Sequence, residues 1–538
     1  MNTEVSLLDC TLRDGAYITG GDFGEPVIRG MISKLQAAGT DVIECGWLKN
    51  DPCPPGSVYY HTPEDLRRYL ARKNPNCTYT VMIDWDRYDL TNLPPYDGTS
   101  LDAIRVVFPR GRHRQGMEVG RGIREKGYRV FFQAANTMAY SGEELEELAE
   151  AVNGGEAECL SIVDTFGAMY PEDLERIVHA LHRLLKPEVK LGFHSHNNQQ
   201  LSFALTIRFI QLLRDTGRKI VVDASLCGMG RGAGNATTEL VTSYLNRKCQ
   251  CHYDMDAVMD AIDIYMEYFK ENYHWGYSTP NFIAGLYGCH VNNIGYLLKN
   301  HRTSARDMRN VIAALPAEDR TKYDYDLLER VYLQNQSLQV DDGAAVARLR
   351  KALRGRTVFL ITPGKSAQRE RERIQARIRE EDPVVMGVNA ILPGYAYDAL
   401  FFVNAARYEY ARDAYPRQFG ETRHILLSSV KNRPEGDEVI LGFHRVIKRG
   451  WEYYDNAAIC ALRLMELLEV KRVVVAGFDH FQARYNESYA DSFLPSPNPA
   501  ENRWAELNGE IAEMLADFRR NAVYSRDIEF ITPSGFGS

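Results

Sequence analysis

Short apolar runs recur along the first half of the chain at intervals that fit strands separated by helices. Eight such runs lie within residues 1–253, and amphipathic segments separate most of them. Parallel strands that are buried on both faces read as continuous apolar runs, and the connections between them are usually helical. Eight β/α units of this length are typical of a (β/α)₈ TIM barrel and favour closure over an open, doubly wound sheet. The runs are Val5–Leu12, Asp41–Trp47, Tyr79–Trp85, Ala103–Phe108, Arg129–Asn136, Cys159–Thr165, Lys190–His196 and Ile220–Cys227.

Strand signals stop after residue 253 and return after residue 350. Helical periodicity predicts a helical appendage and connector over residues 254–350. Six further apolar runs, interleaved with helical segments, predict a Rossmann-like α/β domain of unknown role over residues 351–538. We therefore expect an α/β protein in three parts. The six runs are Thr357–Thr362, Val384–Asn389, Ala399–Val403, His424–Ser428, Glu438–Gly442 and Arg472–Gly477.

The composition excludes several kinds of partner. The chain carries 64 Lys and Arg against 72 Asp and Glu, a net charge of −8, and has no basic block, so we expect neither nucleic acid nor an anionic membrane surface as a partner. It has no apolar run long enough to cross a bilayer and no signal-peptide pattern. Ten scattered cysteines do not form a disulfide framework, so we expect a cytoplasmic protein. We also expect a homo-oligomer.

Polar residues gather at the predicted C-terminal ends of the barrel strands, where a TIM barrel has its active site. Asp14 follows the first run, and His194 and His196 end the seventh. Residues i and i+2 of a strand share a face, so the two imidazoles can share a metal ion with Asp14; a hydrogen-bonded polar rim is the alternative. Such a set leaves coordination positions open, which suits Mn²⁺, Mg²⁺, Co²⁺ or Zn²⁺. Four more polar residues at strand ends are candidates for substrate binding: Glu44, Asp84, Gln133 and Asp164.

Three motifs resemble those of the DRE-TIM metallolyases. They are LDCTLRDG at Leu8–Gly15, FHSHNN at Phe193–Asn198 and GMGRGAGN at Gly228–Asn235. That superfamily includes 4-hydroxy-2-oxovalerate aldolase, 3-hydroxy-3-methylglutaryl-CoA lyase and the isopropylmalate and homocitrate synthases. The resemblance covers roughly residues 1–300 and is greatest to the aldolase branch, which also has a helical region after the barrel.

This resemblance implies a metal-dependent carbon–carbon lyase that cleaves a 4-hydroxy-2-oxo acid to pyruvate and an aldehyde, or forms it from them through a pyruvate enolate. A surface-polysaccharide or sugar-acid pathway is one in which such an enzyme could act. It implies Asp14, His194 and His196 as metal ligands, with Mn²⁺ or Mg²⁺ favoured, and Asn235 as a further ligand or a contact to one. Arg13 would stabilise the enolate that forms on cleavage, and a permanent cation suits that role. A structural salt bridge from Arg13 to Glu44 or Asp84 is the alternative.

The chain departs from the aldolase pattern at the general base. The aldolases carry a histidine three residues after the metal aspartate, where this chain has Tyr17. A tyrosine moves a proton only when its pKa is lowered or when a water helps. The segment GLYGCH at Gly285–His290 resembles the one that places a tyrosine over the barrel mouth in the aldolases. Tyr287 is therefore a candidate for that role and His290 for the base; the alternative is that both are core residues of a helix.

Two other classes of function stay open. One is a Claisen-type acyltransferase of the same superfamily, although Ala16 and Tyr17 replace the residues that follow the synthase motif. The other is a nucleotide-sugar-binding, glycosyltransferase-like protein in which the barrel is a partner module, because residues 456–480 faintly resemble Rossmann-like sialyltransferase-type domains. A docking or oligomerisation role for residues 351–538 is the alternative to that resemblance.

Overall fold

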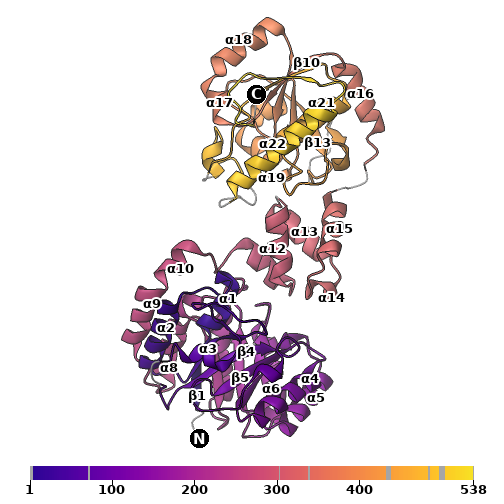
Figure 1. The fold of residues 1–538 in the computed structure, drawn as a ribbon. Coiled ribbons are helices and arrows are strands. Elements are labelled where there is room, and N and C mark those ends of the chain that lie inside the picture. The colour runs from indigo at the N-terminus through magenta and orange to yellow at the C-terminus, as the bar shows by residue number, and fades with distance from the viewer. Residues whose placement is uncertain are drawn as a thin grey trace. The chain divides into compact units, whose positions relative to one another are not determined.

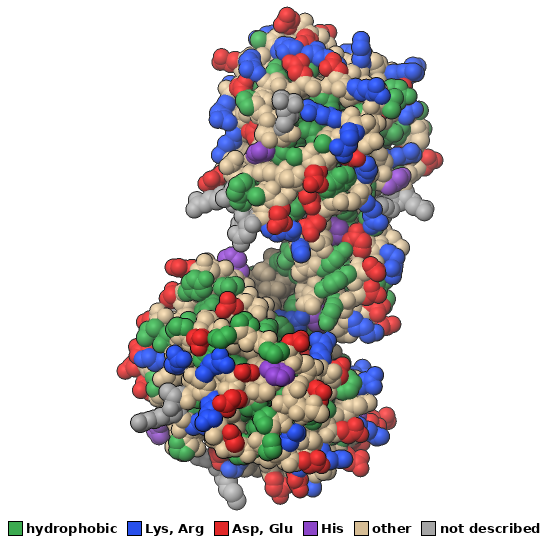
Figure 2. Space-filling view, in the orientation of Figure 1, with side chains coloured by type: hydrophobic (Ala, Val, Ile, Leu, Met, Phe, Trp, Pro, Cys, Tyr) green, Lys and Arg blue, Asp and Glu red, His purple; other side chains and the backbone are tan. Residues whose placement is uncertain are grey.

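The computed structural model describes residues 4–70, 73–301, 303–336, 340–431, 438–482, 485–495 and 503–536. Contacts divide the chain into two compact units, Met1–Val291 and Asn292–Ser538, each with its own sheet (Figure 1). On the face drawn in Figure 2, basic and acidic side chains are interspersed over the surface of each unit. None of the helices in the described ranges has both the length and the apolar character needed to cross a membrane.

The first unit contains the predicted TIM barrel. Its strands pair in parallel in the order β1-β9-β8-β7-β6-β5-β4-β2, and β1 also pairs with β2, which closes the sheet. A short strand, β3 (Tyr59–Tyr60), lies beside β2 outside the ring. The barrel strands are β1 (Val5–Asp9), β2 (Val42–Leu48), β4 (Thr78–Asp84), β5 (Ala103–Phe108), β6 (Arg129–Ala134), β7 (Cys159–Asp164), β8 (Lys190–Ser195) and β9 (Ile220–Ala224).

In the described part of the chain, helices follow seven of the eight barrel strands, a 3₁₀ turn follows β4, and three more helices come after the one that follows β9. They pack on the outside through apolar faces such as those of Ile28 and Ile32 on α2, which are fully buried. The helices are α1 (Thr11–Thr19), α2 (Glu25–Ala37), α3 (Pro63–Arg67), α4 (His113–Glu125), α5 (Gly142–Gly154), α6 (Pro171–Leu184), α7 (Ser202–Leu213), α8 (Thr238–Lys248), α9 (Met255–Tyr265), α10 (Glu267–Asn272) and α11 (Thr279–Leu286).

The barrel interior is layered, because alternate residues of each strand point inward. One buried layer is mostly apolar, and four strands contribute Val42, Ala103, Phe131 and Val221 to it. Two residues further along the same strands, toward their C-terminal ends, the buried side chains are polar. These are Glu44, Arg105, Gln133 and Asp223. The metal-site residues follow at the strand ends.

The prediction of a strand as far as Leu12 is wrong. Strand β1 ends at Asp9, and Arg13 and Asp14 lie in the first two turns of α1. The carboxylate of Asp9 accepts a hydrogen bond from the backbone N–H of Thr11 at 2.9 Å, a local contact that competes with continued strand pairing. Asp14 is therefore presented from a helix start at the barrel mouth.

The second unit contains an open sheet in which every strand pairs in parallel. The strand order is β14-β13-β12-β11-β10-β15-β16, so β10 is flanked by β11 on one side and by β15 on the other. This is the predicted Rossmann-like arrangement. The strands are β10 (Thr357–Ile361), β11 (Val384–Val388), β12 (Ala399–Phe402), β13 (Arg423–Leu427), β14 (Val439–Leu441), β15 (Arg472–Ala476) and β16 (Asp527–Phe530).

Helices of the second unit both precede the sheet and alternate with its strands. Helices α21 and α22 lie together in Figure 1. Since α9 to α11 fall in the first unit and α13 to α16 in the second, the predicted helical region is shared between the units. The helices are α12 (Val291–Asn300), α13 (Ala305–Ala314), α14 (Ala317–Arg320), α15 (Tyr325–Gln336), α16 (Gly343–Leu353), α17 (Lys365–Arg369), α18 (Arg371–Glu381), α19 (Ala405–Ala414), α20 (Pro416–Gly420), α21 (Ala457–Leu467) and α22 (Trp504–Asn521).

Candidate metal centre

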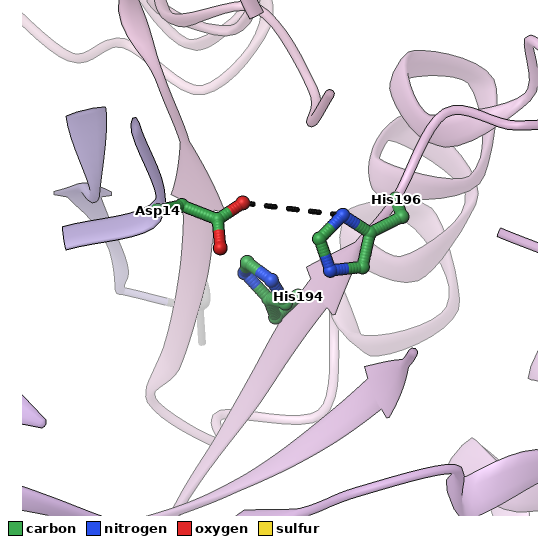
Figure 3. A group of neighbouring side chains, drawn as sticks. All are labelled: Asp14, His194 and His196. Atoms are coloured by element: carbon green, nitrogen blue, oxygen red, sulfur yellow. Dashed lines mark ion pairs between the residues drawn. The ribbon is translucent and has the colours of Figure 1, made fainter. Parts of the chain in front are cut away.

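Asp14, His194 and His196 meet at the mouth of the barrel (Figure 3). Asp14 lies in α1, His194 lies in β8, and His196 directly follows that strand. One ligand atom of each residue lies within 4.8 Å of the others, and the three residues are buried. The Oδ2 atom of Asp14 is 3.9 Å from Nδ1 of His196. The structure thus brings the three predicted ligands together, and metal binding by them stays a prediction.

The surroundings keep Asp14 and His196 in the forms that bind a metal, and they orient His194. Burial alone would raise the pKa of Asp14, but the charge of Arg13 and the two imidazoles hold it well below its usual range. Burial lowers the pKa of His196 to about 4, so its imidazole is neutral at pH 7. The Nδ1 atom of His194 is 3.0 Å from Oδ2 of Asp223, which fits donation from Nδ1 and leaves Nε2 with its lone pair for a metal.

Two buried atoms beside these side chains lack hydrogen-bond partners in the described part of the chain. They are Oδ1 of Asn235 and Nδ1 of His196. The amide nitrogen of Asn235 donates to Asp14 at 2.6 Å, which fixes the direction of its oxygen. Buried polar atoms without partners are uncommon, and a cation would satisfy both. A carboxylate, two imidazoles and an amide oxygen fit a divalent ion such as Mn²⁺, Mg²⁺, Co²⁺ or Zn²⁺.

Gly230 makes this arrangement sterically allowed. A Cβ atom at this position would lie 2.3 Å from Nδ2 of Asn235 and 2.4 Å from Oδ2 of Asp14. The glycine of the third motif therefore admits the hydrogen bond between these two side chains.

Arg13 forms one of the salt bridges considered from the sequence, the one with Glu44, and enolate stabilisation by it stays a prediction. Its Nε donates to Glu44 at 2.7 Å, so the salt bridge exists, and its Nη1 donates to Asp14 at 2.5 Å. Its Nη2 has no hydrogen-bond partner among the described residues, although the residue is only 4% exposed. Two guanidinium nitrogens thus fix the side chain, and the third is left to donate to a ligand.

A second buried arginine, Arg105, supports the site from below. Its Nη1 pairs with Glu44 at 2.7 Å, and its Nη2 pairs with Asp223 at 2.5 Å and with Gln133 at 2.8 Å. Asp223 in turn binds His194, so a chain of charged contacts runs from Arg105 to a predicted metal ligand. The sequence analysis did not single out Arg105. An arginine in the apolar run AIRVVF was the available signal, because a charge buried in a strand needs a partner.

The four predicted substrate-binding residues occupy different surroundings. Glu44 and Gln133 belong to the buried network, and the amide nitrogen of Gln133 also donates to Ser161. Asp84 ends β4 with Lys49 at 4.0 Å. Asp164 is buried at the end of β7 and accepts backbone N–H groups of the following loop. Burial raises the pKa of Asp164 to about 7. Substrate contact by these residues stays a prediction.

The candidate bases lie beside a cation that the sequence analysis overlooked. The guanidinium of Arg231 is 4.7 Å from the centre of the Tyr17 ring, and its Nη2 is 3.2 Å from Nε2 of His290. Arg231 is thus a second cation in this region, in addition to Arg13. Desolvation raises the pKa of Tyr17 to about 12, although the residue is 45% exposed. Desolvation and the charge of Arg231 lower the pKa of His290 to about 3.

The GLYGCH segment lies against loops at the barrel mouth. Gln199, which follows β8, donates to the backbone oxygen of Phe282 at 3.3 Å, and the His290 ring meets that of Phe166. Tyr287 follows α11 and is partly buried. Its role over the reacting atoms stays a prediction.

Comparison with known proteins places the first unit in a family. A family model described as HMGL-like matches residues 114–264. A 4-hydroxy-2-oxovalerate aldolase of Roseiflexus castenholzii is 38% identical over 262 residues, which cover 48% of this chain and 75% of that protein. An oxaloacetate decarboxylase of Mycobacterium tuberculosis is 27% identical over 262 residues, with the same coverage. A solved hydroxymethylglutaryl-CoA lyase from Pseudomonas aeruginosa is 18% identical, with a TM-score of 0.39, over 49% of this chain and 91% of that chain.

The barrel and its motifs therefore define an enzyme of the lyase class. More narrowly, the chain belongs to the HMGL-like, or DRE-TIM, family, and its first unit is aldolase-like. The predicted family membership is confirmed. The family model ends at residue 264, so the second unit lies outside it.

Proposed function

We propose that this chain is a divalent-metal-dependent aldolase that cleaves or forms a 4-hydroxy-2-oxo acid through a pyruvate enolate. The observation that carries the proposal is the position of Arg13, which contacts the metal-site carboxylate of Asp14 and keeps one buried nitrogen without a partner. Asp14, His194 and His196 would hold the metal, with Asn235 beside them, and Mn²⁺ or Mg²⁺ is favoured. The bound metal would act as a Lewis acid toward the 2-oxo acid.

The protein's own groups have defined tasks in such a reaction. On cleavage, the C3–C4 bond breaks, its electron pair forms the enolate, and the proton of the C4 hydroxyl goes to a base, which leaves an aldehyde. The Nη2 atom of Arg13 donates to the oxygen on which negative charge develops. The buried contacts of Arg13 with Glu44 and Asp14 hold this donor in place before the reaction begins.

The protonated hydroxyl of Tyr17 suits it to act as a general acid in the addition direction. With a pKa of about 12, its hydroxyl is protonated at pH 7 and donates a proton more readily than it accepts one. In the addition, the enolate carbon attacks the aldehyde, and the aldehyde oxygen gains a proton, which Tyr17 can supply. In cleavage, the reverse reaction, Tyr17 would have to accept the C4 hydroxyl proton in its phenolate form, which is rare at pH 7. A water molecule and His290 are the other candidate bases, and a His290 pKa of about 3 makes it a weak one.

Decarboxylation of oxaloacetate is the second candidate function. It breaks the C3–C4 bond with loss of carbon dioxide and forms the same pyruvate enolate, but it removes no hydroxyl proton. The protonated state of Tyr17 and the low basicity of His290 favour it, because neither group is a strong base at pH 7. A relative named oxaloacetate decarboxylase supports the same candidate.

Exchange of pyruvate methyl protons in D₂O, followed by proton NMR, tests the enolate chemistry without knowledge of the aldehyde. We expect exchange that requires a divalent metal and that falls to the rate of free metal in the His194→Ala/His196→Ala variant. The matched control is His252→Ala/His274→Ala, which removes two exposed histidines of the same unit. Exchange no faster than with metal alone would refute the proposal, and stoichiometric metal in the first variant would refute the site.

Two substrates then separate the candidates. Cleavage of 4-hydroxy-2-oxovalerate to acetaldehyde and pyruvate indicates an aldolase, and release of carbon dioxide from oxaloacetate indicates a decarboxylase. Tyr17→Phe divides them further. It should slow the aldolase reaction and leave decarboxylation almost unchanged, because only the first moves a proton on oxygen.

A further inference from the structure

A pocket opens in the second unit at the C-terminal edge of its sheet. It is lined by the loops that follow β10 and β15, at Thr362–Gly364 and Gly477–Asp479, and by residues after β11 and β12. The chain leaves β10 for β11 on one side and later returns to β15 on the other, so the pocket lies at the point where the strand order reverses. Open parallel sheets bind ligands at this point, because the two loops diverge there.

Arg407 carries an unpaired charge at this pocket. The residue lines the pocket and is 4% exposed, and its Nε and Nη1 have no hydrogen-bond partner in the described ranges. The ring of Tyr489 lies 4.6 Å from the guanidinium carbon and supports one face of it. A buried charge without a counter-ion is strongly unfavourable, so binding of an anion beside Arg407 would be favourable.

The position of Arg407 on its helix strengthens this requirement. Asn404 caps α19 by accepting the backbone N–H of Arg407 at 3.0 Å, so Arg407 lies in the first turn of that helix. The N-terminus of a helix carries a partial positive charge and favours acidic side chains. A buried cation there is unfavourable in the free protein. An anionic ligand would interact favourably with both the guanidinium and the helix terminus.

The pocket's own carboxylates do not hydrogen-bond Nε or Nη1 of Arg407. Asp307, Asp455 and Asp479 also line the pocket, but in the described part of the chain these two nitrogens have no hydrogen-bond partner. Asp479 accepts hydrogen bonds from the backbone and the hydroxyl of Ser366. Carboxylates that line a pocket can accept hydrogen bonds from hydroxyl groups of a ligand.

The remaining walls are largely aromatic. Phe443, Phe478, Phe481 and Tyr489 line the same pocket, and all four are at most 8% exposed. Aromatic walls bind planar rings through apolar and stacking contacts. The pocket thus combines a place for an anionic group, acceptors for hydroxyls and a surface for a ring.

We propose that this pocket binds a nucleotide, with its phosphate on Arg407 and the first turn of α19, and its base against the aromatic side chains. The planar guanidinium presents parallel N–H donors that match two phosphate oxygens. This second site is independent of the proposed aldolase reaction, because every residue that forms it lies in the second unit.

The test is titration calorimetry of the full-length protein, treated with EDTA, with the ribonucleoside mono- and diphosphates of A, C, G and U. We expect at least one nucleotide to bind, and its phosphate-free nucleoside to bind at least tenfold more weakly. Arg407→Met should weaken binding at least tenfold, and Arg407→Lys should weaken it less, since the charge is kept and the fork is lost. Arg417→Met, at a surface arginine whose side chain is 89% exposed, should bind as the wild type does.

A second variant keeps the test independent of the folding of Arg407→Met. Tyr489→Leu leaves the arginine and removes the ring beside it, and it should weaken nucleotide binding several-fold. The Asp14→Ala variant should bind normally, which distinguishes this site from the barrel. Three results would overturn the proposal: no binding by any of the eight nucleotides, equal binding by wild type and Arg407→Met, or tighter binding of pyruvate than of every nucleotide.

Discussion

Each unit of this protein buries an arginine beside its candidate site, and the two arginines differ in their partners. Arg105 in the barrel has three partners for its terminal nitrogens, Glu44, Gln133 and Asp223, and only its Nε lacks one among the described residues. Arg407 in the second unit has no hydrogen-bond partner for Nε or Nη1 among the described residues. Both are at most 4% exposed. A buried arginine with partners is part of the scaffold of its site, whereas one without them indicates where a ligand binds.

Arg13 is intermediate between these two cases. Its contacts with Glu44 and Asp14 resemble those of Arg105, but its Nη2 resembles the unpaired atoms of Arg407. A group that acts on a reacting oxygen must be held rigidly and must also keep a donor for the substrate. Arg13 meets both conditions. The three arginines therefore predict three different responses to substitution.

The largest expected difference is in stability. Arg105→Met leaves the charges of Glu44 and Asp223 buried without their partner, which should lower the free energy of unfolding of the barrel by about 3–5 kcal/mol. Arg407→Met leaves no broken ion pair, so the ligand-free second unit should lose less than about 1 kcal/mol or gain stability. Urea unfolding measures both variants, and hydrogen exchange by mass spectrometry assigns each transition to its unit.

Equal losses in the two variants would contradict this comparison. A large loss in Arg407→Met would show that its charge is stabilised within the free protein, and the argument for a bound anion would fail. Arg417→Met is the control for general effects of replacing an arginine, since that side chain is exposed and pairs only with Glu421 at the surface.

The next largest effect concerns catalysis by Arg13. Arg13→Ala should slow metal-dependent exchange of pyruvate protons by about 10²–10³-fold, the loss typical of one preorganised electrostatic contact. Arg13→Lys should recover part of the rate, because the charge is restored without the fork. Metal content of the purified variants is the necessary second measurement. If Arg13→Ala loses its metal, the role of Arg13 is to hold Asp14 and not to stabilise the enolate.

A smaller effect is expected from Asp223, which connects Arg105 to the metal site. Asp223→Asn weakens the contact that orients His194, and loss of such a contact typically lowers metal affinity about 10–100-fold. Competition with a fluorescent chelator measures the affinity. Asp164→Asn is the matched control, since that buried carboxylate accepts backbone N–H groups of Ala168 and Met169 and no imidazole. An equal loss of affinity in both variants would contradict an orienting role.

Much of the fold could be predicted from the sequence, because buried parallel strands are apolar on both faces. All eight barrel strands lie within the predicted runs or within one residue of them. The sequence analysis missed β16 and α19. Residues Asp527–Phe530 form a short, only partly buried edge strand. Helix Ala405–Ala414 spreads its apolar and charged residues around its axis, so it has no clear helical periodicity.

The three predicted metal ligands could be found from the sequence to a similar extent, but the buried network that holds them in place could not. Asp14, His194 and His196 stand in short motifs, and the i, i+2 spacing of the histidines places them on one face of a strand. The partners of Arg105 are 61 and 118 residues away, at Glu44 and Asp223, and no local pattern connects them. The same holds for Arg407, whose importance depends on the absence of a partner and not on any motif.

The smallest predicted effect concerns His290, a half-buried histidine that is neutral at pH 7. Arg231 lies 3.2 Å from Nε2 of His290, and a protonated imidazole could not accept a hydrogen bond from it. Burial and this charge lower the pKa of His290 to about 3 in the folded protein, against about 6.5 when unfolded. Between these values the unfolded chain binds a proton that the folded chain does not. Stability of the barrel therefore falls as the pH is lowered from about 6.5 toward 3.

His290→Gln should remove this contribution, because glutamine can accept the hydrogen bond and does not titrate. The melting temperature of the barrel should then fall less between pH 6.5 and pH 4 in the variant than in the wild type. The control is His252→Gln, at an exposed histidine of the same unit, which should fall as the wild type does. Parallel curves for wild type and His290→Gln would show that His290 is protonated without penalty. His290 would then be a stronger base than its surroundings indicate, and the cleavage direction of the proposed aldolase would regain a candidate base.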